Sequence, residues 1–345
     1  MLESVWFFLW GILWAVYFML DGFDLGAGTL MPFLAKSDTE RRVVYNAIGP
    51  FWDGNEVWLI TAGGVTFAAF PRTYAVMFSS LYSALMLILF ALIIRGVAFE
   101  LRGKVDSPAW RRLWDGCLLV GSLVPALLFG VAFANIFAGI PLDARGVYQG
   151  SLFTLLNPYG LLGGVFFLLM FLVHGALWLG VKSGGRVGAE LGERARAAAR
   201  RLWPVLLLAA VAFLSATAWA TDLYANYLEV PVLGLVPLLA VAALLAQRWF
   251  MARGQWWRAW FASAATILLA TLFGVIGLYP RLLPSSLNPA WSLTAFNSSS
   301  SPLTLKIMLG VALVMVPAVI LYQLWVYLRF RHPVAEDDLA YEEAY

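Results

Sequence analysis

Apolar segments of membrane-spanning length recur along the whole chain, and this feature leaves few folds open. An α-helix needs about 20 predominantly apolar residues to cross the hydrocarbon of a bilayer, and several segments exceed that length. Of all residues, 62% are hydrophobic and only 12% are charged, against roughly 25% charged in ordinary soluble domains. A transmembrane β-barrel would show alternating strands of about ten residues instead. We therefore expect an all-α integral membrane protein that forms one transmembrane domain over residues 1–345.

The hydropathy pattern predicts nine spans joined by short polar connections. They lie near residues 5–33, 51–70, 74–99, 114–138, 157–181, 202–222, 231–250, 258–279 and 304–328. The connection over 182–201 is expected to continue the flanking helices, and the Ser-rich connection over 280–303 is expected to be a loop. No cleavable signal is expected, because the apolar start lacks a basic segment before it and a small-residue cleavage site after it.

The distribution of basic residues supports the count of nine and sets the orientation. With nine spans, the side that follows the odd-numbered spans holds 19 Lys and Arg residues, and the opposite side holds four. If 51–70 does not cross, the division falls to 16 against 7. Cytoplasmic connections carry the excess of basic residues. We therefore expect the N-terminus outside and the C-terminus in the cytoplasm.

Five ionisable residues within or beside these apolar segments are candidates for function. Asp21 and Asp24 lie roughly 24–29 Å along the first helix, at 1.5 Å per residue, and Asp53 and Glu56 open the second span from the same side. Lys104 follows the third. A central acid costs roughly 2.5–3.5 kcal/mol in hydrocarbon, so such residues usually face a partner or an aqueous pathway. We interpret the acids as a proton or ion path; the alternative is that they only hydrogen-bond neighbouring helices.

Other conspicuous residues have simpler interpretations. Gly22, Gly26 and Gly28, like Gly63 and Gly64, are expected to let helices approach closely. The stripe of Trp6, Trp10 and Trp14 is interpreted as interfacial anchoring or lipid-facing packing. His174 is the single histidine within a span and is interpreted as a hydrogen-bonded core residue. The single cysteine, Cys117, excludes an intrachain disulfide framework and a cysteine-cluster metal site, and we expect no metal in this chain.

Several motifs together resemble one family. They are Asp21-Gly-Phe-Asp-Leu-Gly-Ala-Gly28, Asp38-Thr-Glu-Arg-Arg42, Phe51-Trp-Asp-Gly-Asn-Glu-Val-Trp-Leu-Ile-Thr-Ala-Gly-Gly64, Gly130-Val-Ala-Phe-Ala-Asn135, Leu156-Asn-Pro-Tyr-Gly160 and Pro284-Ser-Ser286, with basic and acidic residues at the C-terminus. The pattern resembles subunit II of cytochrome bd-type quinol oxidases. The likeness covers essentially the whole chain, and the first two spans carry its specific part.

The resemblance implies a role in aerobic respiration in the bacterial cytoplasmic (inner) membrane. Such oxidases oxidise quinol, reduce O2 to water and take protons from the cytoplasmic side. Their haems, two of type b and usually one of type d, lie in subunit I, which is the expected partner, and a small single-helix accessory subunit is a further candidate partner. Subunit II is implied to have nine helices, two four-helix bundles plus one peripheral helix. No nucleic acid is expected as a partner.

The resemblance also implies roles for single residues. Asp24 and Asp53 match acids associated with proton supply, and Lys104 matches a lysine near a cytoplasmic entrance. Asp21 and Glu56 are expected as secondary members of that path; other members carry Gln at the position of Glu56. Trp52 matches a position that contacts a bound quinone in some members, so ubiquinone or a lipid is a candidate ligand of this chain. Trp58 matches a position near a proposed O2 entrance.

Two other functions fit the same residues. A stand-alone proton-coupled transporter would use Asp24 and Asp53 as coupling sites, and discontinuous helices with an inverted repeat would support it. A transporter would purify colourless and move a solute alone, whereas an oxidase subunit would purify with haem and a larger chain. A purely architectural partner would tolerate every acid substitution. This chain alone is not expected to be catalytic.

Overall fold

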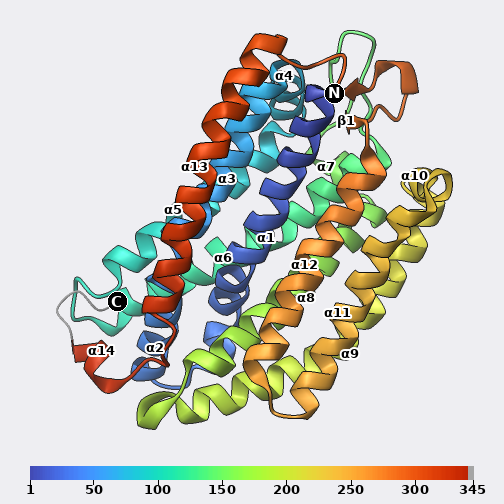
Figure 1. Ribbon diagram of the computed structural model, residues 1–345. Coiled ribbons are helices and arrows are strands. Elements are labelled where there is room, and N and C mark those ends of the chain that lie inside the picture. Colours follow the sequence, from blue (N-terminus) through green and yellow to red (C-terminus); the bar gives the residue numbers. More distant parts are fainter. Residues whose placement is uncertain (341–345) are drawn as a thin grey trace.

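The fold is a bundle of long helices that run roughly parallel to one another (Figure 1). The computed structural model describes residues 1–340, without the side chain of Arg186, so the last residues of the C-terminal likeness lie outside the described part. The long helices are α1 (Leu2–Leu34), α3 (Trp52–Ala69), α5 (Tyr82–Leu101), α6 (Pro108–Ala138), α8 (Pro158–Lys182), α9 (Gly185–Ala220), α11 (Leu235–Ala252), α12 (Trp256–Leu278) and α13 (Pro302–Arg329).

Short elements occupy the two ends of the bundle. They are α2 (Asp38–Ile48), α4 (Pro71–Ser80), α7 (Leu152–Leu155), α10 (Ala225–Glu229), α14 (Glu336–Ala340), the 3₁₀ helices η1 (Pro231–Gly234) and η2 (Pro289–Trp291), and the strands β1 (Arg281–Leu283) and β2 (Leu293–Thr294). The two strands pair antiparallel, so part of the Ser-rich connection is an ordered hairpin. The basic connection after α8 continues as the first turns of α9, as the sequence predicts.

Eight helices in the described chain are long and apolar enough to cross a membrane by length and composition. The structure therefore supports an all-α membrane protein, and the count of nine stays a prediction. The predicted span that is missing from these eight is α3, whose 18 residues include two acids. A second difference from the sequence expectation is a break at Leu81, which separates α4 from α5 where one helix over 74–99 is predicted.

Helix α1 lies at the centre of the packing. It contacts α3, α6, α8 and α12, while α8 packs closely on α9 and α11 on α12. Phe18 of α1 shows why this centre is dense, because its ring centroid lies 5.1–5.5 Å from those of Phe129, Phe133 and Phe167. Such edge-to-face pairs add about 0.5–1.5 kcal/mol each beyond their buried area. In contrast, α13 lies at the edge of the bundle, with its main contacts to α1 and α3 (Figure 1).

Glycine allows α1 and α8 to touch through their backbones. A Cβ at Gly26 would lie 1.8 Å from the carbonyl oxygen of Phe171, and one at Gly175 would lie 2.3 Å from the amide nitrogen of Ala27. Both distances are far inside van der Waals contact, so only glycine fits this crossing. The predicted role of Gly63 and Gly64 is wrong within this chain, since nothing lies within 4 Å of a Cβ at either position.

The interpretation of Trp6 and Trp10 as interfacial anchors or lipid-facing residues is also wrong, whereas Trp14 is only partly buried. Trp6 and Trp10 are buried in the bundle. The Nε1 of Trp6 donates to the Leu305 carbonyl at 3.0 Å, and that of Trp10 donates to Thr66 Oγ1 at 2.9 Å. A four-residue spacing places side chains on one helix face, but it does not say whether that face meets lipid or protein. Here the face meets α3 and α13.

Polar caps begin two of the long helices. Asn157 accepts a hydrogen bond from the Gly160 amide at 2.8 Å before α8, and Ser301 accepts from the Thr304 amide at 3.2 Å before α13. A proline follows each cap, where its missing N–H costs nothing because no helical acceptor exists there. The motif over 156–160 thus marks a helix start.

Ion pairs tie the helix ends together on the side where α2 lies. Asp115 of α6 accepts hydrogen bonds from Arg102 at 2.7 Å and from Arg41 at 2.8 Å. Glu40 of α2 pairs with Arg194 of α9. Partial burial of Glu40 opposes ionisation, but hydrogen bonds from the Lys36 amide and Arg194 hold the pKa of its carboxyl below the usual value. The motif over 38–42 therefore contributes to ordering this basic end of the bundle.

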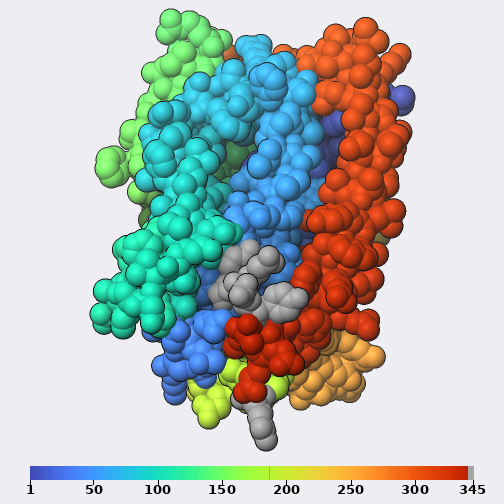
Figure 2. Space-filling view, turned by 90° about the vertical axis from the view of Figure 1, so that its left-hand side faces the viewer, coloured from blue at the N-terminus to red at the C-terminus, as the bar shows by residue number. Residues whose placement is uncertain are grey.

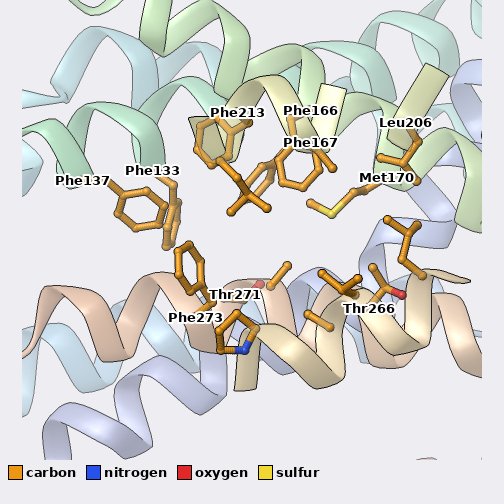
Figure 3. Close-up of a pocket in the computed structure, with 17 residues that line it drawn as sticks. Phe133, Phe137, Phe166, Phe167, Met170, Leu206, Phe213, Thr266, Thr271 and Phe273 are labelled. Atoms are coloured by element: carbon orange, nitrogen blue, oxygen red, sulfur yellow. The ribbon is translucent and has the colours of Figure 1, made fainter. Parts of the chain in front are cut away.

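One small, mainly apolar cavity lies among the helices α6, α8, α9, α11 and α12. It has a volume of about 70 Å³ and is lined mainly by phenylalanine and aliphatic side chains from α6, α8, α9, α11 and α12 (Figure 3). The hydroxyls of Thr266 and Thr271 also reach this region, but each donates to a carbonyl of its own helix at 2.8 and 2.9 Å. This cavity offers no group for proton chemistry.

Candidate functional site

Two buried acids and one partly buried acid surround one buried arginine at the junction of α1, α3 and α5. Arg95 donates two hydrogen bonds to Asp21, Nη2 to Oδ1 at 2.7 Å and Nη1 to Oδ2 at 3.1 Å. Its guanidinium also lies 3.9 Å from Oδ2 of Asp24 and 3.8 Å from Oε1 of Glu56. The side chains of Arg95, Asp21 and Asp24 are fully buried. We call these four residues the acidic cluster.

The surrounding helices position the cluster. Asp21 and Asp24 share a face of α1 because they are three residues apart. Glycine at position 121 of α6 leaves room for the arginine, since a Cβ there would lie 2.6 Å from the Cβ of Arg95. The hydroxyl of Tyr17, one turn before Asp21, donates to Asp21 Oδ2 at 3.1 Å. Asp21 is therefore held by the bidentate arginine fork and a tyrosine.

Asp24 is held differently from Asp21. Asn55 of α3 donates its amide to Asp24 Oδ2 at 2.7 Å and to the Leu20 carbonyl at 3.2 Å. The Oδ1 atom of Asp24 is buried and has no hydrogen-bond partner in the described part of the chain. The amide oxygen of Asn55 accepts from the hydroxyl of Tyr327 on α13 at 3.0 Å. A hydrogen-bonded chain thus runs from α13 to Asp24.

Asp53 lies outside the acidic cluster, at the beginning of α3, and is exposed. It lines a groove of about 650 Å³ between α3 and α5, together with Glu56, Trp52, Gly96 and Glu100 and a set of apolar residues. Figure 2 shows the face where residues 52–101 lie between α13 and the first half of α6. Glu56 belongs to both the groove and the cluster, because its side chain is 21% exposed and reaches Arg95.

Asp53 also lines a second, polar space at the basic end of the bundle. This cleft has a volume of about 780 Å³ and reaches Asn55, Tyr327 and His332. Lys182 helps to form its wall, since its ammonium donates to the carbonyls of Phe330 and His332. The cleft therefore connects the basic end of the bundle to both Asp53 and the Tyr327–Asn55 pair.

The two predicted tryptophans differ in their surroundings. Trp52 stacks on Phe99, with ring centroids 5.1 Å apart and planes 4° apart, and it lines the groove between α3 and α5. Its Nε1 is buried and has no hydrogen-bond partner among the described residues. Trp58 is 5% exposed and donates to Gln323 Oε1 at 2.7 Å. Gln323 in turn donates to the Gly54 carbonyl at 2.6 Å, which fastens α13 to α3.

Lys104 is not brought to the acids. It is exposed and follows the end of α5 in the turn that leads to α6. The basic residue at the acids is Arg95, which the sequence interpretation did not select and which was counted among the 19 residues of the cytoplasmic side. The sequence does indicate Arg95 as unusual, because it is the single charged residue in the predicted span over 74–99. Intramembrane charges usually pair with one another or mark a pathway.

His174 is a hydrogen-bonded core residue, as predicted. It is fully buried, its Nε2 lies 3.1 Å from the Met19 carbonyl oxygen, and its ring stacks on Trp260 with centroids 5.2 Å apart. The Met19 carbonyl thus occupies the Nε2 position, whereas Nδ1 is buried and has no hydrogen-bond partner among the described residues. No group of three or more His, Cys, Asp or Glu side chains in the described residues could hold a metal ion.

A family comparison decides the assignment. The sequence profile described as cytochrome bd terminal oxidase subunit II matches residues 2–330. The chain belongs to the cytochrome bd terminal oxidase subunit II family. It is 38% identical over 337 residues to the cytochrome bd ubiquinol oxidase subunit 2 of Bacillus subtilis (strain 168), with 98% of each chain covered. It is 37% identical over 376 residues to the cytochrome bd-I ubiquinol oxidase subunit 2 of Escherichia coli (strain K12), with 98% of this chain and 96% of that one covered.

A solved structure has the same fold. A chain in the structure of bd oxidase from Geobacillus thermodenitrificans matches with a TM-score of 0.72, over 94% of this chain and 99% of that chain. The sequence identity is 18%, so this match bears on the fold alone. As a member of this bacterial family with many apolar helices, the chain is a multi-pass protein of the bacterial cytoplasmic membrane and a subunit of a respiratory oxidoreductase.

Proposed function

We propose that this chain is subunit II of a bd-type quinol:O2 oxidoreductase, that it supports a haem-bearing subunit I, and that it conducts protons from the cytoplasmic side toward the site of O2 reduction. Haems b and d, or b alone, in the partner would supply electron transfer and O2 reduction. Relatives of nearly equal length are named as ubiquinol oxidase subunits. Family membership favours this function over a stand-alone transporter.

The proposed topology has nine crossings, with the N-terminus outside and the C-terminus in the cytoplasm. The N-terminus and the described C-terminal part lie at opposite ends of the bundle (Figure 1), which supports an odd number of crossings. Helix α3 is about 27 Å long at 1.5 Å per residue, close to the thickness of the hydrocarbon. Without the buried Arg95, the distribution of basic residues is 18 against four, so the positive-inside rule still favours this orientation.

The proton path rests on one observation: three acids meet at a single arginine in the buried part of the bundle, and one of them reaches an open groove. Three carboxyl groups around one guanidinium can hold a proton that moves among them. Glu56 contacts the cluster and lines the groove that also contains Asp53. We propose that protons pass from the cytoplasm to Asp53, then to Glu56, and then to Asp24, with Asp21 held as the arginine's main partner.

The groove between α3 and α5 is also proposed as part of the surface that subunit I covers. Glu56 and Asp53 would otherwise meet lipid, and an acid exposed to hydrocarbon costs several kcal/mol. A protein partner or water on this face removes that cost. Helix α13 borders the same face (Figure 2) and few of its residues are buried in this chain, which agrees with a partner on that side.

The remaining predicted residues keep more limited proposed roles. Trp52 borders the groove with a buried indole N–H that has no partner in the described chain, so a quinone carbonyl or a lipid ester could accept a hydrogen bond there. Trp58 is proposed to border an O2 entrance, although its indole is engaged by Gln323. Lys104, on the basic surface, is proposed to attract proton-carrying groups near the cytoplasmic entrance.

The test is Asp53→Asn in the assembled complex. The substitution keeps the size of the side chain but removes proton exchange, so O2 reduction should slow by about tenfold, below the roughly hundredfold that a group acting directly on the reacting atoms contributes. The haem absorption spectrum should remain that of the wild type. Asp106→Asn is the matched control, because Asp106 is 94% exposed and pairs only with Arg111. Normal turnover and normal proton uptake in Asp53→Asn would leave this chain an architectural role.

A further inference from the structure

A second groove, separate from the acidic cluster, lies between α13 and the helices α1 and α12. Its volume is about 630 Å³, and its walls are almost entirely apolar. This size falls within the roughly 300–1,000 Å³ typical of small-molecule sites. Lining residues from α1 include Met19 and Leu20, those from α12 include Trp257 and Phe261, and those from α13 include Leu324.

Aromatic rings form the inner wall of this groove. Trp178 lies 5.1 Å from Trp260 and 6.0 Å from Trp257, and Trp257 lies 6.2 Å from Phe261, as measured between ring centroids. Tyr327 of α13 lies 6.2 Å from Trp178. These rings come from the end of α8, the beginning of α12 and the end of α13, so the groove is at the basic end of the bundle. Tryptophan and tyrosine are enriched at the level of lipid headgroups in membrane proteins.

Most polar groups that line the groove are already engaged, but the buried indole N–H of Trp260 has no hydrogen-bond partner in the described chain. Gln323 accepts from Trp58 and donates to the Gly54 carbonyl. The hydroxyl of Tyr327 donates to Asn55, and the indole N–H of Trp178 donates to the Ala47 carbonyl at 2.8 Å. A ligand in the body of the groove would therefore find one free buried donor, the indole N–H of Trp260. This favours an alkyl chain whose ester carbonyl accepts that single hydrogen bond over a ring that needs hydrogen bonds to several carbonyls.

One positive charge lies at the end of the groove. Arg331 follows the end of α13, lines the groove and is exposed. No carboxylate of the described residues lies within ion-pair distance of it, as is also true of Arg329 at the end of α13, but Arg331 is the arginine among the described residues that lines this groove. Basic residues between transmembrane helices at the cytoplasmic side are suited to anionic lipid headgroups. The unpaired arginine at the end of an apolar, aromatic groove thus matches an anionic amphiphile.

We propose that this groove binds one anionic phospholipid from the leaflet at the basic end, with an alkyl chain along the aromatic wall and the phosphate at Arg331. The lipid would fill the space between α13 and the rest of the bundle. Helix α13 is otherwise fastened by a few hydrogen bonds, including those of Gln323 and Tyr327, so the lipid would add apolar contact to a helix that has little of its own. The site is independent of the proposed proton path.

The test counts lipids on the intact complex. The oxidase is transferred to nanodiscs of phosphatidylcholine with a minor fraction of phosphatidylglycerol. Native mass spectrometry then reports the lipids that remain bound to the complex after it is released from the nanodisc. Arg331→Gln should lower retained phosphatidylglycerol about fivefold, the effect of one basic residue near a headgroup. Arg329→Gln is the matched control, because Arg329 lines the polar cleft and not this groove. It should retain phosphatidylglycerol like the wild type.

A second pair of variants tests the alkyl chain. Leu324 is 52% exposed and lines the groove, whereas Leu321 is 66% exposed on the same helix and does not line it. Leu324→Trp should displace lipids of both kinds, and Leu321→Trp should displace neither. Equal retention of phosphatidylglycerol in Arg331→Gln and wild type would overturn the proposal. So would a quinone, and not a phospholipid, disappearing from the organic extract of Leu324→Trp.

Discussion

Removing Arg95 should destabilise the assembled complex more than removing any one acid of the cluster. At an effective dielectric constant of about 20, two unit charges 4 Å apart interact with about 4 kcal/mol. Asp24 and Glu56 lie 3.9 and 3.8 Å from Arg95, and Asp21 lies closer, at 2.7 Å. In the intact cluster, the cost of removing these charges from water offsets much of this attraction. When one partner is removed, the net loss is about 3–5 kcal/mol, because the other charge stays buried alone.

The loss should be largely restored by neutralising Asp21 as well. Arg95→Gln leaves the Asp21 carboxylate without its bidentate donor, whereas Arg95→Gln with Asp21→Asn replaces both partners by neutral amides of similar size. Replacing both partners of a buried pair is often nearly neutral. A loss of about 3–5 kcal/mol is a large part of the 5–15 kcal/mol that stabilises a typical domain. The single variant should therefore yield little assembled complex, and the double variant should yield much more.

The assay compares the amount of haem-containing complex in membranes and its survival after heating in detergent. Size-exclusion chromatography with haem absorbance measures both for the wild type, each single variant and the double variant. Arg95→Lys is a further variant, and it should restore little, because an ammonium cannot make the two parallel hydrogen bonds of a guanidinium. A single Arg95→Gln variant that assembles like the wild type would refute the reasoning. A double variant no better than the single one would refute it equally.

Two further predictions concern packing and pH. Gly26→Ala should greatly reduce assembled complex, because its Cβ would lie 1.8 Å from the Phe171 carbonyl oxygen, while Gly63→Ala, with nothing within 4 Å, should not; the yield of complex measures both. The hydrogen bond and charge of Arg281 lower the pKa of Asp222 in the folded protein. The pair therefore stabilises the folded state fully at pH values above the ordinary carboxyl pKa of about 4, and this stabilisation is lost as the pH falls through the lower pKa of the folded state. Because Asp222 is 62% exposed, Asp222→Asn should cost no more than about 1 kcal/mol at neutral pH and nothing in acid, as judged by melting temperature across pH. An equal loss of stability in Asp222→Asn at neutral and at acid pH would contradict the predicted pH dependence.

The acidic cluster shows which part of a site depends on tertiary contacts. Asp21, Asp24, Asp53 and Glu56 stand out in the sequence because an acid in an apolar segment is rare and costly. Their partner Arg95 stands out for the same reason, but charge counting by spans treats it as a cytoplasmic residue. Only the packing of α5 on α6, which itself packs on α1, brings the guanidinium of Arg95 between the acids. Spacing along one helix predicts neighbours on that helix and not the residue that an adjacent helix supplies.

The tryptophans of α1 show a second limit of the sequence pattern. Trp6 and Trp10 carry the pattern of a lipid-facing stripe, yet their indoles are buried and donate to α13 and α3. The amphipathic character of an indole suits an interface with lipid as well as a buried hydrogen bond. The residue types alone cannot separate these environments, because in a membrane both faces of a helix are apolar.

The sequence by itself determined the class of fold, the approximate helices, the family and the acids of the candidate path. These follow from local properties: apolar length matched to the bilayer, the rarity of charge within it, and motifs that need no partner to be seen. The tertiary structure decided the pairing of Arg95, the separation of Asp53 and Lys104 from the cluster, the break at Leu81, and the two grooves beside α3 and α13. Each depends on which helix faces which, and that is set by shape and hydrogen bonding between segments far apart in the chain.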